Sequence, residues 1–71
     1  MVKRWQTGDL VYIPQSARLR KETSTGVTTD YVQLDNPATL LVTGPHRRGY
    51  EVVYQGTRWL VNESDTYPVP A

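Results

Sequence analysis

The side chains that could do chemistry in this sequence are few and scattered. Histidine occurs once, at His46, and the chain contains no cysteine. A nucleophilic triad requires a nucleophile, a base and an orienting group, and the acidic residues show no paired spacing that would supply a general acid and a general base. His46 stands in a polar segment beside Arg47 and Arg48, where we expect an exposed loop side chain. We therefore expect no catalytic residues and no enzyme activity.

Metal and cofactor sites are also not expected. Without cysteine, neither disulfides nor thiolate metal sites can form, and one histidine cannot build a histidine cluster. A domain this small has little interior left for a pocket once its aromatic and aliphatic side chains fill it. We expect no cofactor, no metal and no small-molecule substrate, so a ligand must meet the outside of the protein.

Basic residues mark the surface that we expect to contact a partner. Arg18 and Arg20 alternate along a predicted strand, so both side chains should point the same way, into solvent. A loop with glycines and a proline around its two arginines allows close approach to a phosphate, and tyrosines beside such arginines can stack on bases. The expected partner-binding residues are Arg18, Arg20, Lys21, Tyr31, Arg47, Arg48 and Trp5.

Trp5 has two interpretations. It precedes the first predicted strand, in a segment that can pack across an open end of a barrel and cover the core. Alternatively it is an exposed aromatic anchor for a partner, since tryptophan is enriched at the residues that carry most of the binding energy in protein interfaces.

Length and charge narrow the class of protein. A chain of 71 residues makes one small domain, which we divide into a segment 1–7, a folded body 8–69 and a tail 70–71. Eight basic residues against seven acidic ones leave a net charge of +1, less basic than a dedicated nucleic-acid binder. No apolar run approaches the roughly 18 residues of a membrane span, and no apolar stretch of a signal peptide follows the first residues. We expect a soluble cytoplasmic protein without a membrane partner.

Glycine and proline separate short segments rich in β-branched and aromatic residues, the pattern typical of strands. The segment 17–34 predicts a long early hairpin with its tip near Ser24–Gly26, and Gly44–Gly49 predicts a loop. Apart from this hairpin, five short strands are expected, at 10–13, 39–43, 50–54, 57–61 and 66–69, and residues 62–65 predict a tight 3-10 turn.

The segment 50–61 is the clearest local signal. Gly56 supplies the positive φ that a two-residue hairpin turn at Gln55-Gly56 requires. Such a turn fixes which residues face one another and therefore which share a face. The residues predicted to share the core face are Tyr50, Val52, Tyr54, Thr57, Trp59 and Val61.

Three stretches resemble an SH3-like barrel: "GDLVYIP" at 8–14, "NPATLLVTG" at 36–44 and "YEVVYQGTRWLVNESDTYPV" at 50–69. They look most similar to small uncharacterised SH3-like proteins carried by bacteria and their phages. The resemblance implies an all-β fold, a closed or nearly closed barrel of about five antiparallel strands. It also implies a long early hairpin and a single 3-10 turn before the last strand.

Two SH3-like subfamilies fit less well. Nucleic-acid-binding KOW-type barrels continue their first strand into a glycine-containing loop, where this chain has residues 14–17, "PQSA". Peptide-binding SH3 domains carry a central tryptophan pair, whereas Trp59 stands alone. We expect a non-enzymatic binding module, a protein-interaction adaptor or a phage accessory protein acting on a host complex, with residues 18–31 as its contact surface. The alternative is a KOW-like nucleic-acid binder that uses the arginine and lysine patch.

Overall fold

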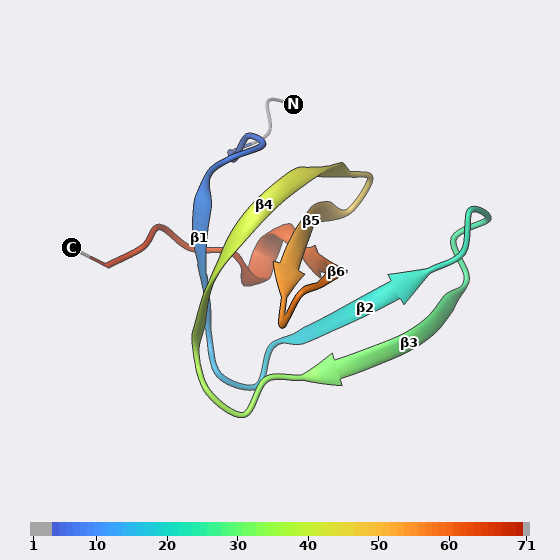
Figure 1. The fold of residues 1–71 in the computed structure, drawn as a ribbon, viewed down its shortest axis with the longest axis horizontal. Helices are drawn as coiled ribbons and strands as arrows, with labels where there is room; N and C mark the ends of the chain where they lie inside the picture. The colour runs from blue at the N-terminus through green and yellow to red at the C-terminus, as the bar shows by residue number, and fades with distance from the viewer. Residues whose placement is uncertain (1–3, 71) are drawn as a thin grey trace.

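A computed structural model describes residues 4–70, which form six strands and one 3-10 turn (Figure 1). The predicted limits of the two terminal segments, 1–7 and 70–71, therefore fall partly outside the described residues. The elements are β1 (Leu10–Ile13), β2 (Arg18–Glu22), β3 (Thr28–Gln33), β4 (Ala38–His46), β5 (Gly49–Tyr54), β6 (Thr57–Asn62) and η1 (Glu63–Asp65).

The strands form one antiparallel sheet in the order β1-β4-β5-β6-β2-β3. Strands β1 and β3 are its edges, so the sheet is not closed. The predicted all-β antiparallel fold is confirmed, whereas a closed or nearly closed barrel of about five strands is not: the sheet has six strands. The early hairpin accounts for the difference. Strand β2 joins the rest of the sheet at one register pair, Arg20 with Leu60, and β3 pairs with β2 alone among the described strands. In Figure 1 the two strands extend away from the others.

Strand β4 replaces most of the loop predicted at Gly44–Gly49. It continues through His46, with Gly44 opposite Glu51 and Pro45 opposite Tyr50. The register between β4 and β5 shifts between Val42 and Gly44, just before Pro45. Such an irregularity is a place where a sheet tolerates a proline. The β4–β5 turn is reduced to Arg47 and Arg48.

The β5–β6 hairpin confirms the predicted register. Tyr54 lies opposite Thr57, and Val52 lies opposite Trp59. The turn residues Gln55 and Gly56 both have positive φ, 52° and 76°, as a type I′ turn requires. A second glycine, Gly49, is fixed by packing, because a Cβ there would collide with the carbonyl oxygen of Val61.

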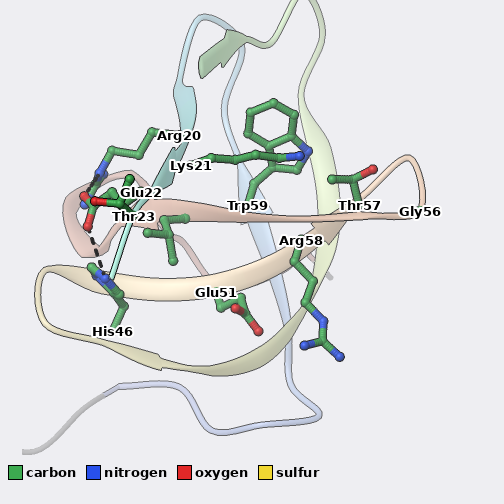
Figure 2. A pocket seen from close by; sticks show the side chains of 11 residues that line it. Arg20, Lys21, Glu22, Thr23, His46, Glu51, Gly56, Thr57, Arg58 and Trp59 are labelled. Atoms are coloured by element: carbon green, nitrogen blue, oxygen red, sulfur yellow. Dashed lines mark hydrogen bonds and ion pairs between the residues drawn. The ribbon is translucent and has the colours of Figure 1, made fainter. Parts of the chain in front are cut away.

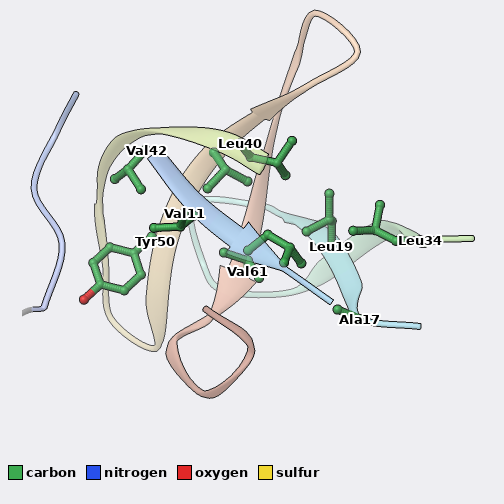
Figure 3. Packing of buried hydrophobic residues seen from close by; sticks show 10 residues of the cluster. Val11, Ala17, Leu19, Leu34, Leu40, Val42, Tyr50 and Val61 are labelled. Carbon is green, nitrogen blue, oxygen red and sulfur yellow. The ribbon is translucent and has the colours of Figure 1, made fainter. Parts of the chain in front are cut away.

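The core lies on the inner face of the curved sheet (Figure 3). Three of the residues predicted for the core face of the β5–β6 hairpin are completely buried: Tyr50, Val52 and Val61. Trp59 and Tyr54 are only partly buried against the cluster. Tyr54 lies next to the turn, and Trp59 carries Lys21 over its ring. The buried apolar residues are Val11, Ile13, Ala17, Leu19, Leu34, Leu40, Val42, Tyr50, Val52 and Val61.

The chain returns to β1 after η1. Tyr67 forms an isolated bridge with Tyr12, in which each backbone N–H donates to the other carbonyl, at 2.8 and 3.0 Å. The predicted 3-10 turn is confirmed, whereas the last strand predicted at 66–69 is reduced to this bridge. The bridge covers the middle of the β1 edge, and the β3 edge has no such cover among residues 4–70.

Candidate functional site

Two predicted contact residues meet on the projecting β2–β3 hairpin. The guanidinium of Arg18 lies 5.8 Å from the centroid of the Tyr31 ring, a distance at which cation and ring attract each other. Arg18 is exposed, and Tyr31 is 63% exposed. The pair stands on the outer surface of the sheet, where both groups can reach another molecule.

Arg20 does not face solvent, and the prediction that it does is wrong. Its side chain is 16% exposed. The Nε group donates to Oε2 of Glu22 at 2.8 Å, and Nη1 donates to Oδ1 of Asn62 at 2.6 Å. These bonds fasten the base of the hairpin to the end of β6, so the charge of Arg20 is largely neutralised and its role is structural.

Glu22 links this arginine to the only histidine. Nε2 of His46 lies 3.4 Å from Oε1 of Glu22, and the histidine side chain is 22% exposed, so the expectation of an exposed loop histidine is also wrong (Figure 2). The hydrogen bond from Arg20 holds the pKa of Glu22 below its usual value. Burial opposes this shift, while the nearby positive charges of Arg20 and Arg47 favour it.

Lys21 lies over Trp59. Its Nζ lies 4.7 Å from the centroid of the indole. The two side chains line an open groove of about 620 Å³ between β2 and the β5–β6 hairpin, with Glu51 and Arg58 on its opposite wall (Figure 2). Glu51 accepts a hydrogen bond from Oγ1 of Thr43 at 2.8 Å. The groove carries both signs of charge and therefore favours neither an anion nor a cation.

The β4–β5 turn lies beside the tip of the projecting hairpin. A Cβ on Gly26 would lie 2.7 Å from Nη2 of Arg47, so the arginine reaches the glycine directly. Arg48 is exposed, and its carbonyl accepts the backbone N–H of Glu63 at 3.2 Å. The fold thus brings Arg47 against the tip of a hairpin that is far from it in the sequence.

Trp5 stands apart from the hairpin residues. It packs against the core cluster, and its Nε1 donates to Oγ1 of the buried Thr66 at 2.9 Å. The guanidinium of Arg4 lies 4.9 Å from its ring centroid. This is the covering position that one of the two interpretations predicts, with part of the residue still accessible.

Sequence reasoning missed the cluster of Arg20, Glu22, His46 and Asn62. The pairing of Arg20 with Glu22 could have been predicted from the sequence, because residues i and i+2 of a strand share a face and these two have that spacing. The rest of the cluster depends on the β4–β5 register, which brings His46 from a distant strand.

Among residues 4–70, no group of three or more His, Cys, Asp or Glu side chains is arranged to hold a metal ion. The same part of the chain contains no helix long and apolar enough to cross a membrane. Comparison with protein-family models, with curated proteins and with solved structures gave no match, so the candidate site stands on its geometry.

Proposed function

We propose that this protein is a non-enzymatic binding module that contacts a partner protein through the β2–β3 hairpin. The observation that carries the proposal is the exposure of this hairpin: five of the six β3 residues are exposed, and the Arg18–Tyr31 pair stands on its surface. Projecting segments on a rigid scaffold commonly carry binding, and tyrosine and arginine are over-represented among residues that dominate interface energies.

Charge favours a protein over a nucleic acid. Binding to a phosphate backbone depends on cations that are free to neutralise phosphates. Arg20 is already paired with Glu22 at 2.8 Å, and Lys21 has Asp30 as its cross-strand neighbour. The hairpin is therefore close to neutral, as the whole chain is.

The alternative is a nucleic-acid-binding barrel. It is favoured by the Arg18–Tyr31 pair, which has the composition of a base-stacking platform, and by the exposed arginines of the β4–β5 turn beside the hairpin tip. In this alternative the contacts come from Arg18, Tyr31, Arg47 and Arg48 rather than from Arg20.

We further propose a kinship with SH3-like proteins of bacteria and phages, in which the module acts as an adaptor or an accessory protein on a host complex. Support comes from the single 3-10 turn that precedes the return of Tyr67 to β1. The cytoplasm is the compartment that we propose, because a chain without cysteine suits a reducing environment.

Affinity capture from a lysate of the source cells tests the proposal. The bait variant carries Arg18→Glu and Tyr31→Ala, and we expect it to lose proteins that the parent retains after nuclease treatment. A matched control carries Arg58→Glu and Tyr67→Ala, two other exposed positions, and should capture the same proteins as the parent.

Three outcomes would contradict the proposal. Equal capture by the hairpin variant would exclude this surface, and equal loss by the control would make the effect nonspecific. Capture that disappears with nuclease and weakens steeply with salt would support the nucleic-acid alternative instead.

A further inference from the structure

No strand among residues 4–70 pairs with the outer edge of β3. This strand spans six residues and pairs with β2 alone among the described strands. The other edge strand, β1, is shorter, and its edge bonds to Tyr67. An exposed edge of this length is a template for another strand unless the sequence blocks it.

Hydrogen bonding indicates which β3 groups point away from the sheet. The N–H of Leu34 donates to the carbonyl of Ala17 at 2.9 Å. Along an antiparallel strand, the N–H and C=O groups of successive residues point alternately toward the partner strand and away from it. Because those of Leu34 point toward β2, those of Gln33 and Tyr31 point outward. A second observation agrees, because the N–H of Tyr31 donates to the side-chain oxygen Oδ1 of Asp30 at 2.9 Å.

We infer that the β3 edge is a strand-pairing surface for a second copy of this chain, and that the Asp30 carboxylate keeps it closed. The inference concerns the backbone edge and does not depend on the proposed binding through side chains.

The edge is self-complementary in one register. A two-fold axis through Val32 places the outward groups of Tyr31 opposite those of Gln33 in the second copy, and the reverse. Each pair then exchanges N–H···O=C bonds as in an antiparallel ladder. Val32 lies opposite its own copy, and β-branched cross-strand pairs stabilise sheets.

Asp30 opposes this pairing in two ways. Its Oδ1 occupies the Tyr31 N–H that the incoming carbonyl needs. Its charge also lies at the middle of the edge, where a second strand would remove it from water. Its cross-strand neighbour Lys21 lies over Trp59, and burying a charge without a close partner is costly. Charged side chains on edges commonly prevent such pairing.

The test is self-association of purified full-length variants, measured by sedimentation equilibrium over a range of concentrations. Asp30→Val removes both the charge and the acceptor, and we expect its dimer dissociation constant to be at least about tenfold lower than the parent's. Asp30→Asn keeps an acceptor and loses only the charge, so it should give a smaller change in the same direction. Thr28→Val is the matched control, since it adds a β-branched apolar residue to β3 and leaves Asp30 in place.

A second substitution localises the contact. Tyr31→Pro removes the outward N–H, and proline is tolerated on an edge strand at such a position, so Asp30→Val combined with Tyr31→Pro should behave like the parent. The inference is overturned if neither Asp30 variant associates more strongly than the parent. Equal association of Thr28→Val, or undiminished association of the double variant, would overturn it as well.

Discussion

The β5–β6 and β2–β3 hairpins are built from strands of similar length but stand in opposite environments. The first lies in the middle of the sheet, between β4 and β2, and includes three completely buried side chains. The second ends at the free edge, and most of its β3 side chains are exposed. Stability is therefore concentrated in the central hairpin, while the peripheral hairpin is free to carry contacts with other molecules.

The largest expected difference comes from one tyrosine in each hairpin. Tyr50 is 0% exposed; its hydroxyl donates to Oε2 of Glu63 at 3.0 Å and accepts the N–H groups of Arg4 and Trp5 at 2.9 and 3.2 Å. Tyr50→Ala should cost about 3–5 kcal/mol, roughly the whole stability of a domain this small. The equivalent change at Tyr31 should cost less than about 0.5 kcal/mol, as surface substitutions do.

Urea and thermal unfolding followed by circular dichroism measure both effects. We expect the Tyr50→Ala variant to lack a cooperative transition at 25 °C and the Tyr31→Ala variant to unfold with the parent. Similar losses at the two positions would mean that the peripheral hairpin carries as much of the core as the central one.

The next largest difference in stability between the two hairpins is expected from one glycine in each, replaced by alanine. In Gly49→Ala the new methyl group meets the backbone carbonyl of Val61, which can move only if β5 and β6 separate, so we expect a loss of more than about 3 kcal/mol. In Gly26→Ala it meets the end of the flexible Arg47 side chain, and the cost comes mainly from the positive φ of 89°, about 1–3 kcal/mol.

Unfolding free energies of the two alanine variants, measured side by side, test this order. Arg47→Ala in the Gly26→Ala background separates the two costs at the hairpin tip. If that variant recovered all of the lost stability, contact with the arginine and not backbone strain would be the cause.

The features that could be predicted from the sequence are those between residues close together in the chain. A two-residue turn fixes the whole β5–β6 register, because each pair follows from the one before it, and Gln55-Gly56 marked that turn. The spacing of Arg20 and Glu22 also carried the information for their pairing. The partners of β2 and β4 depend on contacts between segments far apart in the chain, so the extension of β4 to His46 and the open edge at β3 could not be derived from periodicity.

The smallest expected effect concerns the ionic cluster at the base of the peripheral hairpin. The pKa of Glu22 is lowered from its usual value of 4.5, mainly by the hydrogen bond from Arg20. A carboxyl group whose pKa is lower in the folded than in the unfolded protein stabilises the fold fully above the unfolded pKa and loses this contribution as the pH falls through the folded pKa. The stability difference between the parent and Glu22→Gln should therefore be constant near neutral pH and shrink below 4.5.

Urea unfolding of the parent and of Glu22→Gln between about pH 7 and about pH 3 measures this difference. Arg20→Gln supplies the control, because without the guanidinium the pH-dependent part of the difference should largely disappear. The four proteins form a double-mutant cycle, which isolates the coupling of the two side chains. A difference that stays the same at every pH, or that survives in the Arg20→Gln background, would mean that Arg20 does not hold Glu22 in its charged form, and that the hairpin is fastened to β6 by the Arg20–Asn62 hydrogen bond instead.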